Sequence, residues 1–321
     1  MAENAKIPKN IQQVIINNPK TANKKVVWLN INNPGLKEIE YLRKKYNFNL
    51  LHLHASSAKS FSQRPMVSEG NGYLFMILHF PYFNGEGIVA GEIEFFISNE
   101  YLITLQNNNI AALNDFFNLC KKDQESLTSF EFESSQVLLY ELLEKLMQYC
   151  YLLLDRNSIK ISDVENIIFS TKQKRAVTEI LLLRRNIINF RKIMQNHKNI
   201  IKKLMEMETN IFPEDKSKLF YRKIIEHTKR IWEILENQKE MIEVLNSSNE
   251  SMLNYKISDI MKTLTIFSVI VIPLTLLASI FGMNAVNMPF VGLKHGFWII
   301  ISIMFTASLL MLLYFEKKKW L

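Results

Sequence analysis

Near the C-terminus, three consecutive residues, Gly282, Met283 and Asn284, combine the oxygens and the backbone freedom that a hydrated cation requires. A small divalent cation such as Mg²⁺ gives up its water reluctantly, so neutral oxygens that hydrogen-bond to an intact hydration shell suit it well. Asn284 supplies a side-chain amide oxygen, and Gly282 lets backbone carbonyls approach closely because it has no side chain. We therefore interpret these residues as an ion selectivity site, with Asn284 as the residue that contacts the metal.

This tripeptide lies between two uncharged stretches that are each long enough to cross a membrane. Thr263 to Phe281 and Phe297 to Phe315 each contain 19 residues without a charged side chain. A helix of about 20 apolar residues spans the hydrocarbon core of a bilayer. A buried core helix is the alternative for one such stretch, but two in tandem disfavour it. The sequence predicts a C-terminal membrane hairpin.

Polar side chains recur on one side of the first predicted span. Residues three or four positions apart share one face of a helix. On this face, hydroxyls alternate with bulky apolar side chains that could close a wet passage by dewetting. We interpret it as a pore wall, although Ser and Thr in membrane helices also commonly bond their own backbone or pack at helix contacts. The residues are Met261, Leu264, Ser268, Ile272, Thr275 and Ser279, followed by Gly282.

Two helices cannot enclose a passage alone, so this interpretation requires several copies of the chain around an axis. A ring of identical subunits with head-to-tail contacts satisfies that need. The predicted partners are therefore further copies of the same chain and the lipid bilayer.

The distribution of charge orients the hairpin. Lysines flank its two ends, whereas the loop between the spans has only Lys294 and His295. The positive-inside rule then places both termini and the large front domain in the cytoplasm. The net charge of +8 is spread among acids without a nucleic-acid recognition motif, so we expect no nucleic-acid partner. The flanking lysines are Lys256, Lys262, Lys317, Lys318 and Lys319.

The front of the chain reads as a small mixed α/β domain followed by long helices. Glycine is confined to early positions until Gly282, and long stretches without glycine favour helices. A helix is expected over residues 36–46, and breaks between later helices are expected at 157–162 or 170–173, and at 211–215. The alternation His52-Leu53-His54 predicts an exposed strand edge. Strands are expected at 25–31, 73–80, 92–97 and 101–105.

The last predicted helix meets no proline between residue 215 and Pro273, so it is expected to run from the front domain into the membrane. Apolar residues recur in it at seven-residue spacing, which is typical of a helix with partner helices. The partners could be other copies or this chain's own earlier helices. The first repeat is Ile224, Ile231, Leu245 and Met252, interrupted by Gln238, and the second is Ile234 and Met241.

These C-terminal residues resemble the CorA magnesium transporter family, in which a Gly-Met-Asn signature follows the first of two terminal spans. Ile272-Pro273-Leu274-Thr275 and Met288-Pro289 also look like that pattern. The likeness is dense from about Ser258 to the end and thinner earlier, where Gln63-Arg64-Pro65 matches. Phe290 stands where the family usually has an acid.

The resemblance implies a homopentamer with a cytosolic funnel and a stalk helix that enters the pore. It implies passive uptake of Mg²⁺, often with Co²⁺ or Ni²⁺, across the plasma (inner) membrane, and a gate controlled by intracellular Mg²⁺. Mg²⁺ would thus be both transported and regulatory. Ser258 occupies the position at the cytosolic end of the pore.

Two series of glutamates with seven-residue spacing are possible regulatory sites for Mg²⁺ across a subunit boundary. The alternative, which we favour, is that they are solvated and paired with neighbouring lysines and arginines. No nucleophile, acid–base pair or phosphate loop is apparent, so we expect no enzyme. The series are Glu226, Glu233 and Glu240, and Glu236, Glu243 and Glu250.

The predicted fold class is α+β, with an N-terminal mixed α/β cytosolic domain, a long helical stalk and two C-terminal transmembrane helices. The expected divisions are 1–130 for the α/β domain, 131–260 for the long antiparallel helices and stalk, and 261–321 for the hairpin. Two other functions stay open: a proton-coupled Zn²⁺ transporter of the same superfamily, and a membrane-tethered coiled-coil scaffold.

Overall fold

The computed structural model describes residues 7–17, 25–56, 63–108, 110–122, 134–170, 173–207, 211, 216–283, 288–290, 293–318 and 320. The chain divides into two compact units, Met1–Leu245 and Asn246–Leu321. Helix α8 (Lys216–Phe281) begins in the first unit and ends in the second.

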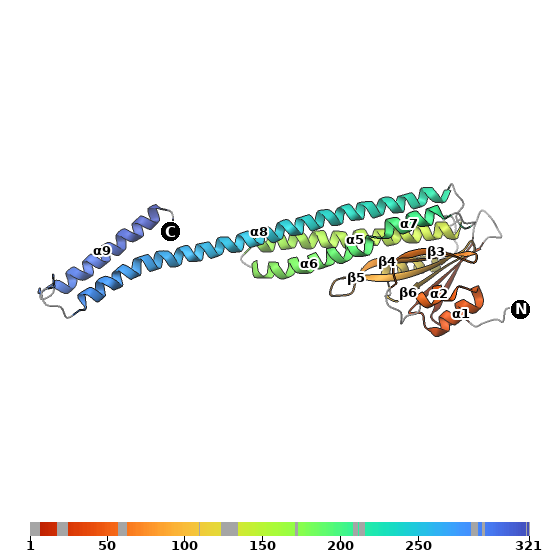
Figure 1. Cartoon of the computed structure of the whole chain (residues 1–321), viewed down its shortest axis with the longest axis horizontal. Helices are drawn as coiled ribbons and strands as arrows, with labels where there is room; N and C mark the ends of the chain where they lie inside the picture. Colours follow the sequence, from red (N-terminus) through yellow and green to blue (C-terminus); the bar gives the residue numbers. More distant parts are fainter. Residues whose placement is uncertain are drawn as a thin grey trace. The chain divides into compact units, whose positions relative to one another are not determined.

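The first unit contains a six-stranded mixed sheet (Figure 1). The strand order is β1-β2-β6-β5-β4-β3, in which β2 and β6 are parallel and the other neighbours are antiparallel. The strands are β1 (Ile11–Asn17), β2 (Lys25–Asn32), β3 (Met66–Gly70), β4 (Tyr73–Phe83), β5 (Ile88–Ile97) and β6 (Tyr101–Gln106).

Helices cover both faces of this sheet, and for that reason its central strands are apolar along most of their length. One face packs in a common core with residues of α1 (Leu36–Tyr46) and α2 (Leu50–Ala55), including the buried Leu42 and Leu53. On the other face, Trp28 of β2 lies 4.9 Å from the ring of Phe117 in α3 (Ala111–Lys122).

Long helices complete the first unit: α5 (Ser135–Phe169), α6 (Gln173–Met194), α7 (His197–Glu206) and the first part of α8. Two side chains of α6 fix it to the start of β5. The Asn186 side chain accepts a hydrogen bond from the backbone N–H of Ile88, and the Asn189 side chain donates one to the Ile88 carbonyl, each at 3.0 Å.

Hydrogen bonds between α5 and α8 show that these helices run in the same direction. The Tyr221 hydroxyl donates to the Gln136 carbonyl at 3.0 Å, and the Gln238 amide donates to the Leu154 carbonyl at 2.8 Å. Ile224 and Ile231 are fully buried within one chain. The chain's own helices therefore cover this part of the seven-residue pattern, and Gln238 is buried with a helix partner in the middle of it.

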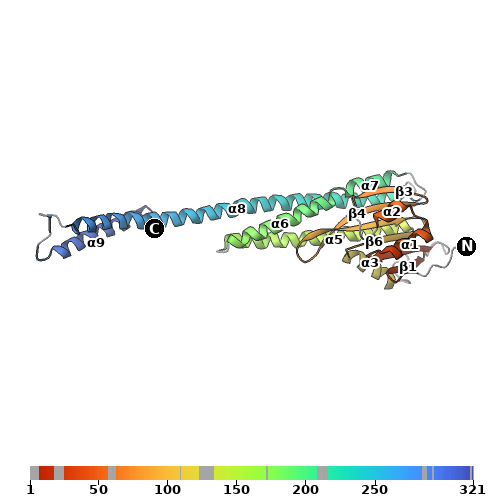
Figure 2. The same cartoon turned by 60° about the horizontal axis from the view of Figure 1, so that its bottom comes forward.

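The second unit is a helical hairpin, in which α9 (Gly296–Lys317) turns back along the end of α8 (Figures 1 and 2). By length and apolar composition, α8 and α9 are able to cross a membrane. Ile266 of α8 and Phe315 of α9 are each only 6% exposed, whereas most large apolar residues of the hairpin are exposed.

The four predicted strands, the helix over 36–46, the break near 170–173 and the two spans are confirmed. The break at 157–162 is wrong, because α5 continues through it. The strand edge at His52-Leu53-His54 is also wrong, since these residues belong to α2. Of the break at 211–215, residues 212–215 lie outside the described residues, and α8 is helical from Lys216.

Candidate functional site

The predicted pore-lining residues lie on one side of α8 in the hairpin unit. Met261, Leu264 and Ile272 are 56%, 56% and 66% exposed in the single chain. The buried Ile266 is two residues from Ser268, which places it about 200° round the helix from that face. The face is thus free to meet whatever surrounds the hairpin. Ser258, Thr275 and Ser279 on α8 are exposed too, and Ser268 is half-buried.

Two hydroxyls of this face bond their own helix. Ser268 donates to the Leu264 carbonyl and Thr275 to the Val271 carbonyl, both at 2.8 Å. This is the backbone bonding that the alternative interpretation named. Each of these bonds uses the one proton that the hydroxyl can donate. The hydroxyl oxygen can then only accept further hydrogen bonds, from donors such as the water around a cation.

The span ends at the first two residues of the tripeptide. The backbone N–H of Gly282 donates to the Ala278 carbonyl at 2.9 Å, and that of Met283 to the Ile280 carbonyl at 3.2 Å. A Cβ at position 282 would lie 3.1 Å from the Ala278 oxygen, which is tight. Gly282 therefore lets the helix close its last turn without a side chain against that carbonyl. Asn284 lies outside the described residues.

A close backbone contact in the loop between the spans was missed from the sequence. Phe290 has a positive φ of 69°, and its carbonyl oxygen points at Gly296, where an added Cβ would overlap it. Only glycine fits at position 296 in this conformation. The signal was present, because Gly296 is one of only three glycines after residue 91.

The two series of glutamates differ in their surroundings. Glu236 binds Arg191 at 2.7 Å and Lys239 at 3.2 Å, Glu243 lies 3.9 Å from Lys239, and Glu250 accepts from the Asn246 amide at 2.9 Å. Glu226, Glu233 and Glu240 all lie on the exposed side of α8. Among the described residues, no group of three or more His, Cys, Asp or Glu side chains could hold a metal ion.

Among the residues that the structure describes, the titratable groups with shifted pKa values belong to the first unit. Burial raises the pKa of the Cys120 thiol to about 12 and also raises that of the Cys150 thiol. Burial lowers the pKa of His197 to about 4, so this histidine is neutral in the folded protein. These buried groups do not contribute charge to an ion pathway.

Comparison with known proteins relates the whole chain to metal-ion transporters. The family described as CorA-like Mg²⁺ transporter protein matches residues 23–318. The chain is 24% identical over 298 residues to the cobalt/magnesium transport protein CorA of Thermotoga maritima, covering 92% of this chain and 83% of that protein. It is 21% identical over 301 residues to that of Methanocaldococcus jannaschii, covering 92% of each.

Solved structures show the same fold. The complete CorA magnesium transporter from Methanocaldococcus jannaschii superposes with a TM-score of 0.82 at 20% identity, covering 92% of both chains. The cytoplasmic domain of ZntB from Vibrio parahaemolyticus gives a TM-score of 0.61 at 12% identity and covers 76% of this chain and 98% of that one. The α+β front domain, the long helix and the two terminal spans thus form one known architecture.

Proposed function

This chain belongs to the CorA-like Mg²⁺ transporter family, and from that premise we propose that several copies form a channel-like pore for Mg²⁺ lined by α8. As a member of a family of ion transporters, the chain is a membrane protein and not an enzyme. The proposed cargo is Mg²⁺, with Co²⁺ and Ni²⁺ as further substrates.

The observation that carries the proposal is the face of α8 from Met261 to Ser279. It is turned away from the buried Ile266, and the hydroxyls of Ser268 and Thr275 keep only acceptor oxygens for outside partners. The oxygens suit the waters of a hydrated cation, and the exposed Met261, Leu264 and Ile272 suit a gate that closes by dewetting. Asn284 and the Gly282 carbonyl complete the proposed outer selectivity site.

The remaining parts of the proposal follow from family membership and sequence. The assembly is a homopentamer in the plasma (inner) membrane with both termini in the cytoplasm. Residues 1–130, 131–260 and 261–321 serve as cytosolic domain, stalk and membrane hairpin. Intracellular Mg²⁺ closes the gate, and the exposed Glu226 of α8 is the candidate for binding it.

The test is Mg²⁺ influx into liposomes that contain the purified full-length protein, with an imposed membrane potential. Asn284→Ala and Gly282→Ala should abolish influx while native mass spectrometry still detects the oligomer. Ser302→Ala, which removes a hydroxyl from α9 rather than α8, is the matched control and should transport normally. Unchanged influx in both tripeptide variants would refute the selectivity assignment.

A proton-coupled Zn²⁺ transporter of the same superfamily is the second candidate, and the fold shared with CorA and with the ZntB cytoplasmic domain does not separate the two. Competition between Mg²⁺ and Zn²⁺ across a pH gradient separates the two. We expect Mg²⁺ influx to be independent of the gradient. The intact Met283 of the tripeptide favours Mg²⁺, since the Zn²⁺ branch tends to alter this residue.

The third candidate, a scaffold anchored by the hairpin, needs apolar spans but no particular polar residues. Scrambling Ser268, Thr275 and Ser279 at constant hydrophobicity should abolish influx if α8 lines a pore. A scaffold would tolerate that change.

A further inference from the structure

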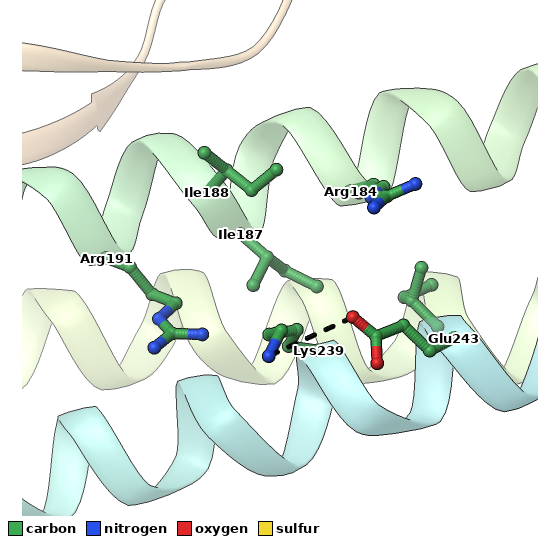
Figure 3. A pocket seen from close by; sticks show the side chains of 7 residues that line it. Arg184, Ile187, Ile188, Arg191, Lys239 and Glu243 are labelled. Atoms are coloured by element: carbon green, nitrogen blue, oxygen red, sulfur yellow. Dashed lines mark ion pairs between the residues drawn. The ribbon is translucent and has the colours of Figure 1, made fainter.

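A groove rimmed by basic side chains lies between α6 and α8 of the first unit (Figure 3). Its cavity volume is about 240 Å³. Ile187 of α6 and Ile242 of α8 are buried at its floor, and Ile188 is 51% exposed at its side. Arg184 and Arg191 stand at the rim. We call these five residues the basic groove.

The charges around the basic groove are only partly compensated within the chain. Arg191 binds Glu236 at 2.7 Å and stacks over Trp232 at 4.8 Å, and Lys239 lies between Glu236 and Glu243. Among the described residues, Arg184 forms no ion pair, and its side chain is exposed. The groove therefore has an apolar floor and an excess of positive charge.

The opposite side of α8 has the complementary character. Glu233 and Glu240 are exposed there, and Val244 is 63% exposed. We call these three residues the acidic ridge. Glu240 and Val244 are each two residues from Ile242, which places them about 160° from the groove floor around the helix. One subunit thus presents the groove and the ridge on different sides, as a head-to-tail ring requires.

The spacing of the charges agrees between the two surfaces. Arg184 and Arg191 are seven residues apart on α6, and Glu233 and Glu240 are seven residues apart on α8, so each pair spans about 10.5 Å along its helix. Each surface also has an exposed apolar side chain. Leu181, one turn from Arg184 on α6, is 60% exposed, and Val244 is the apolar member of the ridge.

Rotational symmetry brings the two pairs to similar heights. Within one chain, Arg191 binds Glu236, which sets the height of α6 against α8. When the ring axis is parallel to α8, rotation from one copy to the next does not change the position of a residue along that axis. Glu233 of the next copy is three residues from the level of Arg191, or about 4.5 Å along the axis. Because α6 and α8 are antiparallel, moving seven residues back from Arg191 to Arg184 corresponds to moving seven residues forward on α8, so Glu240 of that copy lies at a similar level to Arg184.

We propose that the basic groove of one copy binds the acidic ridge of the next copy, with Arg184 facing Glu240 and Arg191 facing Glu233. The inference rests on the proposed homo-oligomer and names the cytosolic surface through which it closes. Arg184 gains an acidic partner, and the exposed Val244 and Leu181 become buried between subunits.

Thiol cross-linking tests this contact in the full-length protein. Arg184→Cys and Glu240→Cys are placed in different copies by co-expression, and the membranes are treated with a short bifunctional maleimide, because the Cβ atoms of an Arg–Glu pair lie too far apart for a direct disulfide. A covalent dimer should form. The native Cys120 and Cys150 are buried, so they add little background. The control pairs Arg184→Cys with Arg222→Cys, on the same side of α8 but about 27 Å from position 240, and should give no dimer.

A charge exchange provides a second measurement if the cysteines are poorly aligned. Arg184→Glu should shift the native mass spectrum from the oligomer toward monomer, and adding Glu240→Arg should restore the oligomer. An intact oligomer with neither cross-link nor charge rescue would overturn the proposed contact and leave the pore proposal standing. A wild-type protein that is monomeric would overturn both.

Discussion

Two isoleucines of the same helix experience opposite surroundings. Ile231, in the first unit, is completely buried, whereas Ile272, in the hairpin unit, is 66% exposed. The chain's own helices remove Ile231 from water, but nothing within one chain does so for Ile272. In water, such exposure of many large apolar residues would be unfavourable, so lipid and, in the proposed pore, other copies surround the hairpin. The comparison shows that the first unit has a packed core within one subunit, whereas the hairpin has none of comparable size.

The largest difference between the two parts of α8 is expected when Ile231 and Ile272 are each replaced by alanine. Ile231→Ala should lower the free energy of unfolding of the first unit by about 2–5 kcal/mol, because it leaves a cavity in a packed core. Ile272→Ala should leave that unfolding unchanged and alter ion influx instead. Chemical unfolding measures the first effect when it is followed by the fluorescence of the buried Trp28 in a background with Trp232, Trp298 and Trp320 replaced by Phe. Liposome influx measures the second.

If both substitutions lowered the free energy of unfolding equally, Ile272 would belong to the same packed core as Ile231. The distinction between the two parts of α8 would then be wrong.

The next effect is expected at the contact between Phe290 and Gly296. Gly296→Ala places a Cβ against the Phe290 carbonyl, so the loop between the spans has to rearrange. We expect Mg²⁺ influx to fall several-fold while the unfolding of the first unit stays within about 0.5 kcal/mol of wild type. Gly85→Ala is the converse control: a side chain at its φ of 101° adds strain in the first unit, so it should lower the free energy of unfolding of that unit and leave Mg²⁺ influx unchanged.

Unchanged influx in Gly296→Ala would show that the loop tolerates another conformation. Its geometry would then have no part in the entrance.

An effect that depends on pH is expected in the sheet of the first unit. Glu94 is fully buried on β5, and burial, together with the nearby Glu92, raises its pKa well above the ordinary value. A raised carboxyl pKa favours the neutral acid in the folded state, so stability is lost as pH rises above the unfolded pKa toward the folded one. The loss is about 1.4 kcal/mol for each pH unit in that interval.

Glu94→Gln imitates the neutral acid and cannot ionise. Its advantage in free energy of unfolding over wild type should therefore grow between pH 5 and pH 8, as measured by chemical unfolding at both values. An equal difference at the two pH values would contradict the raised pKa.

The sequence predicted those elements whose local signals agree with their tertiary surroundings. The helix over Leu36–Tyr46 has Glu38 bonding back to the Gly35 N–H at its start and Asn47 in the left-handed region at its end. The central strands are apolar because both faces are covered. The two spans were predicted because the bilayer requires about 20 uncharged residues whatever the packing.

Other elements depend on partners that are distant in sequence. His52 lies in helix α2, and its ring nitrogens hydrogen-bond with the Tyr73 hydroxyl at 2.9 Å and the Ser68 hydroxyl at 3.1 Å. The alternating pattern of the sequence does not reveal these partners. Ser158 looked like a helix break, but it accepts the amide of the buried Gln238 from α8. The short edge strand β3, with polar residues at its end, was missed because edge strands need little apolar pattern.

For the candidate site, residue types and spacing identified the face of α8, because helical periodicity is a local property. They did not reveal the hydroxyl bonds of Ser268 and Thr275 or the role of Gly296. Those features depend on backbone atoms that approach through space. The partners of the glutamates on α8 likewise required the register between α6 and α8, which only the folded helices define.

Accessibility of single cysteines on α8 tests most directly whether this helix lines a wet passage. Thr275→Cys and, as control, Leu277→Cys, about 200° round the helix, are each reconstituted in liposomes and exposed to Cd²⁺ or a charged thiol reagent. The proposed pore predicts that the reagent blocks Mg²⁺ influx in Thr275→Cys and leaves Leu277→Cys unaffected. Block of Leu277→Cys alone, or of neither variant, would contradict it.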